Sequence, residues 1–103
     1  MRRDQQGLAE EILTRALAQD SSNSKIYAAL GWSQLELGKH IEAETTLKQA
    51  IQLDGTDAYA HNNLGVLYQR LGKQDDAIRE FESALKLNPG LESAKKNLKQ
   101  FRK

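Results

Sequence analysis

The sequence predicts an all-α fold, a right-handed α-solenoid of about six helices stacked as antiparallel pairs. Apolar residues recur at helical spacing nearly from end to end, and no segment alternates convincingly as a β-strand would. Turn-forming and capping residues interrupt this pattern at regular intervals. The pattern also repeats with a fixed period, such that 24–57 aligns on 58–91, and a period of this length is typical of stacked supersecondary units.

The breaks in the pattern place the helices at about 5–20, 24–37, 40–53, 58–71, 74–87 and 91–102. The segments DSSNS (20–24) and DGTD (54–57) supply N-capping side chains for the helices that follow them. Asn-Pro-Gly at 88–90 ends one helix and begins a turn. Gly38 and Gly72 stand where a tight turn between two helices needs a residue that tolerates positive φ.

The repeat divides the chain, which we interpret as one domain over residues 1–103. Residues 24–57 and 58–91 are two whole helix pairs, residues 1–23 are a leading second helix, and residues 92–103 are a C-terminal capping helix. Between the two whole pairs the identities are Leu30/Leu64, Gly31/Gly65, Leu37/Leu71, Gly38/Gly72, Lys39/Lys73, Ala43/Ala77, Ala50/Ala84 and Leu53/Leu87.

These positions resemble the tetratricopeptide repeat (TPR) signature, W-x2-L-G-x2-Y, then A-x3-F, then P. Residues 58–91 provide His61, Leu64-Gly65, Tyr68, Ala77, Phe81 and Pro89 at the matching positions. Residues 24–57 provide Tyr27, Leu30-Gly31, Gln34, Ala43, Leu47 and, in place of proline, Gly55. The resemblance covers the whole chain and implies a protein-interaction fold.

The mid-helix glycines indicate a close helix crossing. A glycine inside a helix costs about 1 kcal/mol relative to alanine, so Gly31 and Gly65 should be compensated by packing. Each recurs with a small residue at a fixed offset on the next helix, Ala43 or Ala77. We expect these small residues to let the two backbones approach, with Leu and aromatic side chains interlocking around them. His61, at the large-ring position, is expected to be a packed core residue.

The resemblance implies that the first helix of each pair lines a concave surface. A helical wheel places a graded groove there: apolar at Ala28, Trp32 and Leu35, rich in amides at Asn62 and Asn63, and basic at Arg70 and Lys96. The full set of expected groove residues is Ala28, Trp32, Leu35, Tyr59, Asn62, Asn63, Val66, Gln69, Arg70, Lys96, Asn97 and Gln100.

Two of these offsets carry specific meaning in the family. Asn63 and Asn97 share an offset at which family members hydrogen-bond a peptide backbone, a task that suits an amide because it both donates and accepts. The basic clamp that some members use for a terminal carboxylate needs lysine and asparagine where this chain has Ala28 and Trp32. The resemblance therefore implies no such clamp. The alternatives to ligand contact are that these asparagines are solvated, and that Trp32 packs within the structure or contacts another copy of the chain.

The leading hypothesis is a protein-interaction scaffold that binds a partner peptide or helix. The alternative is a structural protein that self-associates through the same surfaces. An uncovered apolar edge at Leu8, Ile12 and Leu13 would favour such association if residues 1–103 are not the end of a longer array. Residues 1–57 hold six Lys or Arg against nine Asp or Glu, whereas residues 58–103 hold nine against five, which would favour head-to-tail contact.

Other function classes find little support in the sequence. The basic tail, with Lys95, Lys96, Lys99 and Arg102, could bind nucleic acid, but its Ala94–Leu98–Phe101 stripe is better explained as the face that closes the solenoid. No phosphate-binding loop, nucleophile elbow or Cys-ligated metal motif is present, so we expect no enzyme activity and no cofactor. The segment after Met1 is polar and no apolar run is long enough to span a bilayer, which predicts a cytoplasmic protein.

Overall fold

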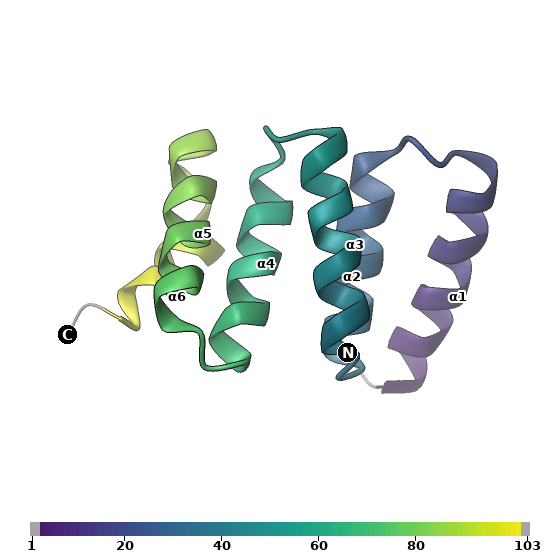
Figure 1. The fold of residues 1–103 in the computed structure, drawn as a ribbon, viewed down its shortest axis with the longest axis horizontal. Coiled ribbons are helices and arrows are strands. Elements are labelled where there is room, and N and C mark those ends of the chain that lie inside the picture. Colours follow the sequence, from purple (N-terminus) through teal and green to yellow (C-terminus); the bar gives the residue numbers. More distant parts are fainter. Residues whose placement is uncertain (1–2, 102–103) are drawn as a thin grey trace.

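The computed structural model describes residues 3–101, with side chains from residue 5 onward. Its helices are α1 (Arg3–Gln19), α2 (Ser24–Glu36), α3 (His40–Leu53), α4 (Ala58–Arg70), α5 (Gln74–Leu87) and α6 (Glu92–Lys99). The molecule is 42 Å long, helices consecutive in the chain run antiparallel, and in Figure 1 α2 lies partly behind α3 and α6 behind α5. The predicted all-α solenoid is confirmed. We call residues 24–57 unit 1 and residues 58–91 unit 2, and the α2 and α4 helices the first helices of these units.

The residues predicted to cap helices and to form turns adopt the expected hydrogen bonds and backbone conformations. The Asn23 side chain accepts hydrogen bonds from the Lys25 and Ile26 amides at the start of α2, and Asp57 caps α4 in the same way. Gly38 and Gly72 adopt φ values of 80° and 78°. Because a positive φ favours glycine, both helix pairs turn at the same residue type in the same conformation.

The chain ends in a shorter helix than the sequence predicts. The α6 helix stops at Lys99, and the Phe101 amide bonds back to the Leu98 carbonyl oxygen in a final tight turn. Residue 102, the last of the predicted helix, lies outside the described residues. Phe101 packs against the core, with its ring centroid 6.2 Å from that of Phe81.

The mid-helix glycines make room for a large side chain. A Cβ added at Gly31 would lie 2.5 Å from Cγ of Leu47, and one at Gly65 would lie 2.6 Å from Cε1 of Phe81. The sequence suggests Ala43 and Ala77 as the partners of the glycines, but the nearest atoms belong to Leu47 and Phe81, one helical turn further on. The crossing therefore combines a missing side chain on one helix with a bulky one on the other.

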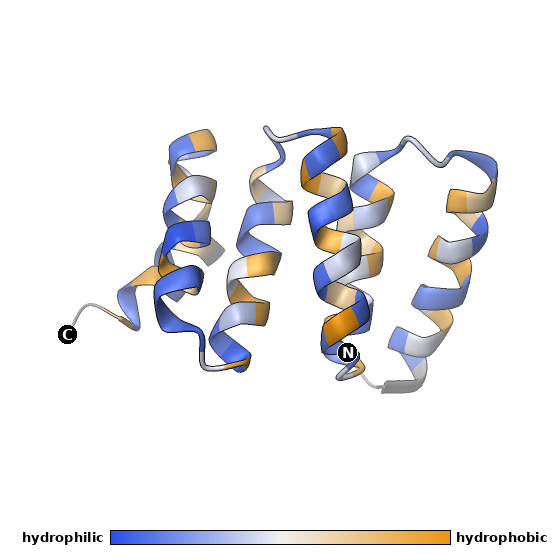
Figure 2. Cartoon of the chain, in the orientation of Figure 1, coloured by the Kyte–Doolittle hydropathy of each residue, from blue (hydrophilic) through white to orange (hydrophobic). Residues whose placement is uncertain are grey.

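The main core follows the interface between successive helices. It contains Leu35, Leu47, Leu64, Leu67 and Phe81, while Trp32 is partly buried against it. Apolar and polar residues alternate along every helix, so each helix keeps a polar side (Figure 2). Of the described helices, none is long and apolar enough to cross a membrane.

Candidate functional site

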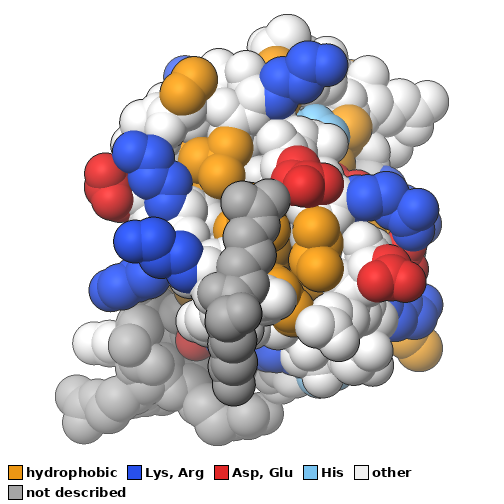
Figure 3. All heavy atoms as spheres, turned by 90° about the vertical axis from the view of Figure 1, so that its left-hand side faces the viewer, with side chains coloured by type: hydrophobic (Ala, Val, Ile, Leu, Met, Phe, Trp, Pro, Cys, Tyr) orange, Lys and Arg blue, Asp and Glu red, His pale blue; other side chains and the backbone are white. Residues whose placement is uncertain are grey.

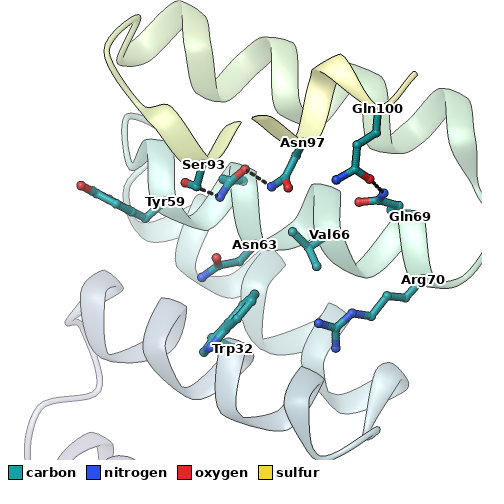
Figure 4. Close-up of a pocket in the computed structure, with 10 residues that line it drawn as sticks. Trp32, Tyr59, Asn63, Val66, Gln69, Arg70, Ser93, Asn97 and Gln100 are labelled. Atoms are coloured by element: carbon teal, nitrogen blue, oxygen red, sulfur yellow. Dashed lines mark hydrogen bonds between the residues drawn. The ribbon is translucent and has the colours of Figure 1, made fainter. Parts of the chain in front are cut away.

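The three helices α2, α4 and α6 lie around a cavity of about 620 Å³. Its walls come from α2, α4 and α6, and most of its lining side chains point into the space between these helices (Figure 4). The lining residues are Trp32, Tyr59, Asn62, Asn63, Val66, Gln69, Arg70, Ser93, Asn97 and Gln100. All except Ser93 belong to the set predicted from the helical wheel.

A second cavity of about 460 Å³ adjoins the first at the N-terminal ends of α2 and α4. It is lined by Lys25, Ala28, Ala29, Trp32, Asp57, Tyr59 and Asn63. Because Trp32, Tyr59 and Asn63 line both cavities, we treat the two as one feature and call it the concave groove. Tyr59 is 59% exposed, which is unusual for a large ring and leaves its face open to a ligand.

The indole of Trp32 lines both cavities. The Arg70 guanidinium carbon lies 6.0 Å from the Trp32 ring centroid, a cation–π distance, and its Nη2 donates to Glu36 Oε1 at 2.8 Å. The Arg70 charge is thus neutralised by a carboxylate from α2. Lys25 and Asp57 bring one charge of each sign to the second cavity. The groove therefore has no excess charge of either sign.

Amide side chains join α4 to α6 along one wall. Asn62 is only 6% exposed, and its Nδ2 donates to Ser93 Oγ at 3.1 Å while its Oδ1 accepts from Asn97 Nδ2 at 3.2 Å. Gln69 Nε2 donates to Gln100 Oε1 at 2.6 Å. Asn62 is therefore a structural bridge, with its amide already used on both sides.

Asn63 is the amide best placed for a ligand. Its Nδ2 lies 3.4 Å from the Ala28 carbonyl oxygen, a long and therefore weak hydrogen bond. No partner for its Oδ1 is found in the described part of the chain. The side chain lies beside Trp32 and faces the groove (Figure 4). It can both accept from and donate to an incoming backbone without breaking a strong contact.

Two predicted groove residues lie elsewhere. Leu35 is 1% exposed and belongs to the core with Leu64 and Leu67, because α2 packs on α4 as well as on α1 and α3. A helical wheel assumes that a helix has one buried side and one open side, whereas α2 is covered by three neighbouring helices. The other residue, Lys96, does not line the groove.

Lys96 lines a separate cavity of about 500 Å³ with Glu92, Ser93, Lys95 and Lys99. This cavity lies on α6 at the end of the molecule seen in Figure 3, where Lys and Arg side chains stand mainly at the rim. The predicted basic end of the groove, built from Arg70 and Lys96, is therefore absent: the structure does not bring the two together.

Four residues line the groove that the predicted set omits. Ala29 shares the offset of Asn63, so the repeat alignment could have included it despite its inert side chain. Asp57 follows from its capping role, which holds its carboxylate at the N-terminal end of α4. Lys25 and Ser93 share the repeat offset of Tyr59, and the helical wheel places Ser93 on the groove side of α6, so the repeat register could have included both.

His61 sits behind the groove on the side of α4 that faces α5. Its Nδ1 lies 2.8 Å from Glu80 Oε1 and its Nε2 lies 3.2 Å from the Gly55 carbonyl oxygen. Both partners are acceptors, so both bonds form together only when the ring carries two protons. The hydrogen bond to Glu80 accordingly raises the pKa of His61, against the lowering effect of burial. His61 is partly buried and held by polar partners, and it belongs to none of the apolar core clusters. No metal-binding group of three or more His, Cys, Asp or Glu occurs among the described residues.

Comparison with known proteins decides the family. Models for a tetratricopeptide repeat and a TPR repeat match residues 58–91 and 33–72. The second TPR domain of human RPAP3, solved with the HSP70 peptide SGPTIEEVD, superposes with a TM-score of 0.81 at 35% identity, covering 91% of this chain and 78% of that one. This chain belongs to the tetratricopeptide repeat family.

Two further relatives of this TPR chain come from Arabidopsis. The TPR domain of Arabidopsis OM64 superposes with a TM-score of 0.91 at 26% identity, over 96% of this chain and 82% of that one. The chloroplastic TPR protein PYG7 of Arabidopsis thaliana is 37% identical over 102 residues, which is 95% of this chain. The chain spans between 13% and 34% of the length of the curated relatives it matches.

Proposed function

We propose that the concave groove binds an extended segment of a partner protein, which makes this TPR chain a protein-interaction module. The observation that carries the proposal is the groove itself, a continuous hollow where α2, α4 and α6 present open aromatic, aliphatic and amide side chains. The peptide complex of the human RPAP3 domain supports it, because that domain shares the fold at 35% identity.

The lining suggests how a segment would bind. An apolar side chain of the partner would occupy the second cavity, against Ala28, Trp32 and Tyr59. Its backbone would then run along α4, where Asn63 can pair with one peptide group. Asn97 lies further along the groove and keeps its Oδ1 for a second contact, since only its Nδ2 is used in the bridge to Asn62.

The charge of the groove favours an uncharged segment. Arg70 is paired with Glu36, and the lysines of α6 lie outside the groove. Ala28 and Trp32 also stand where a carboxylate clamp would need lysine and asparagine. We therefore propose that this groove prefers a neutral segment with an apolar anchor over an acidic terminal peptide such as SGPTIEEVD.

A peptide-display selection on the folded chain, followed by affinity measurement, tests the proposal. Selected peptides should bind Trp32→Ala at least 10-fold more weakly, because a central aromatic anchor is worth about 2 kcal/mol or more. Asn63→Ala should weaken them by a smaller factor, of about 3-fold to 10-fold. Ile41→Ala is the matched control, since Ile41 is an apolar residue that is 82% exposed on α3, away from the groove.

Circular dichroism and melting temperature would show that each variant remains folded. Selected peptides whose affinity is unchanged in both Trp32→Ala and Asn63→Ala would contradict the groove as the binding site. A selection dominated by acidic C-terminal peptides would contradict the preference for a neutral segment while leaving the site in place.

A further inference from the structure

The lysines of α6 gather around the cavity of about 500 Å³ that lies outside the concave groove. We call it the lysine cavity, because Lys95, Lys96 and Lys99 line it together with Glu92 and Ser93. Its lining thus holds three positive charges against one negative charge. A further cavity at the start of α5 is lined by two basic and two acidic side chains, so this excess is not general to the surface.

The charges of the lysine cavity are available to a ligand. Within the part of the chain that the structure describes, Lys96 and Lys99 form no ion pair with a carboxylate. Lys95 lies 3.5 Å from Glu92 Oε1, and the two side chains are 46% and 86% exposed. So exposed a pair contributes little to stability and can exchange partners readily. Lysines are common on solvated helix sides, so their position relative to the groove is decisive.

Ser93 connects the lysine cavity to the concave groove, because its side chain lines both. It is exposed and lies on the α6 wall of the groove (Figure 4). Ser93, Lys96 and Lys99 follow one another at intervals of three residues, so each is turned by about 60° around the helix axis from the one before. This row of side chains leads from the groove wall to the outer side of α6.

We propose that the lysine cavity binds an acidic flank of the same partner segment whose neutral core occupies the concave groove. This inference rests on the function proposed for the groove and specifies the partner further. The segment would place its apolar anchor beside Trp32, pass α4 and cross α6 at Ser93. Asp or Glu side chains beyond that point would pair with Lys96 and Lys99.

The groove itself keeps its preference for a neutral core, since the acidic residues would lie outside it. A clamp for a terminal carboxylate would instead need its cations inside the groove, where Ala28 and Trp32 stand. The two cavities therefore divide the recognition between them. Apolar and amide contacts in the groove select the core of the segment, and charge selects its flank.

Helix packing sets the distance between the anchor and the acidic flank. Packed helices lie about 8–10 Å apart, and an extended chain advances about 3.3 Å per residue. The path from α2 past α4 to the far side of α6 is therefore covered by about six to eight extended residues. The expected partner carries a neutral stretch with one apolar anchor, and acidic residues at about this distance from the anchor.

Tailed peptides test the proposal. The tightest peptides from the display selection receive a short oligoglutamate tail or a matched oligoserine tail, at either end and at the distance given above. At about 50 mM salt, the glutamate tail at one end should raise affinity about 3-fold to 10-fold over the serine tail, because several exposed ion pairs add small contributions. Raising the salt to about 0.5 M should remove most of this gain by screening.

Variants of the chain locate the effect. Lys96→Gln/Lys99→Gln should abolish the gain and leave the affinity for serine-tailed peptides unchanged. Lys86→Gln is the matched control for Lys99→Gln, since each removes one charge and Lys86 is exposed on α5 and lines neither the groove nor the lysine cavity. The charge-reversed Lys96→Glu/Lys99→Glu should prefer an oligolysine tail, which a merely general charge effect would not require of these two positions.

The outcomes separate this proposal from the function of the groove. No gain from a glutamate tail at either end, or a gain that Lys96→Gln/Lys99→Gln retains, would overturn the proposal and leave the groove as a binding site. Serine-tailed peptides that bind Trp32→Ala and Asn63→Ala as well as the parent chain would overturn both. A short oligothymidylate that binds the parent chain more tightly than the glutamate-tailed peptides, and fails to bind Lys96→Gln/Lys99→Gln, would also overturn the proposal, since the occupant would then be nucleic acid.

Discussion

Units 1 and 2 share their turn, their cap and their glycine crossing, yet they fill the buried positions around that frame differently. Phe81 in unit 2 stands where unit 1 has Leu47. Tyr68 donates its hydroxyl to Glu44 Oε2 at 2.9 Å, whereas Gln34, at the same position in unit 1, has a buried Oε1 with no partner among the described atoms. A few small or capping residues thus set the backbone arrangement that both units share, while the volume and polarity of the buried side chains differ between them. We expect unit 2 to be the more stable of the two.

Removing the bulky residue at each crossing should have the largest effect. Phe81→Ala should lower the free energy of unfolding by about 4 kcal/mol and Leu47→Ala by about 3 kcal/mol, since both side chains are fully buried. Phe81→Ala should lower the free energy of unfolding more than Leu47→Ala because the ring of Phe81 also contacts Phe101. Chemical denaturation measures both values. A cost for Leu47→Ala equal to or above that of Phe81→Ala would contradict the ranking of the two units.

Adding a side chain at the glycine of each crossing should have the next largest effect on stability. Gly65→Ala and Gly31→Ala should each cost about 1–2 kcal/mol, because overpacking outweighs the gain in helix propensity. The ring of Phe81 adapts less readily than the branched chain of Leu47, so Gly65→Ala should be the worse. Gly7→Ala is the control: Gly7 lies in α1 with no atom within 4 Å of an added Cβ, so it should stabilise the chain. Thermal melts of the three variants distinguish packing from propensity.

Copying unit 2 into unit 1 should bring a smaller gain. Gln34→Tyr removes a buried oxygen without a partner and places a phenol near Glu10, which lies one repeat before Glu44. We expect about 1 kcal/mol of added stability. Gln34→Phe tests the hydroxyl: an equal gain would show that only the lost oxygen mattered, and a loss in both variants would show that the α1–α2 interface cannot accept a ring.

The smallest effect should be a dependence of stability on pH near neutrality that His61 brings to unit 2. The pKa of His61 is raised above that of the unfolded chain, chiefly by Glu80, so the folded state binds more protons. The stability it adds is fully present below about pH 6.5 and is lost as the pH rises through the folded pKa. His61→Tyr, which copies Tyr27, should flatten the unfolding free energy between about pH 6 and 8. A variant with the same slope as the parent chain would assign the dependence to other groups.

The repeat register is what made much of the architecture predictable. Asn23, Asp57, Gly38 and Gly72 act through local backbone geometry, which depends on sequence neighbours alone. Their roles and the order of six helices could therefore be predicted. The same register also pointed to most groove residues, because it shows which helix offsets vary between units.

The predictions that are wrong concern contacts between residues on different helices. Leu35 was misplaced because its burial depends on where α4 crosses α2, which no single-helix wheel contains. The sequence predicts a basic end of the groove at Arg70 and Lys96, but the long side chain of Arg70 reaches Glu36 in the preceding unit, and such pairing depends on rotamers. The glycine crossing was predicted as a close contact, while its true partners, Leu47 and Phe81, follow from side-chain direction rather than from spacing.

The shortness of α6 has a consequence for recognition. One side of the concave groove is the eight-residue α6, held to α4 by the hydrogen bonds that Asn62 forms with Ser93 and Asn97. So short a helix frays readily, and the concave groove is complete only in molecules in which α6 is formed. The proposed binding of a partner segment would therefore be thermodynamically linked to the order of α6, and occupancy of the groove should slow amide proton exchange in the final turn of α6 even where no ligand atom reaches it.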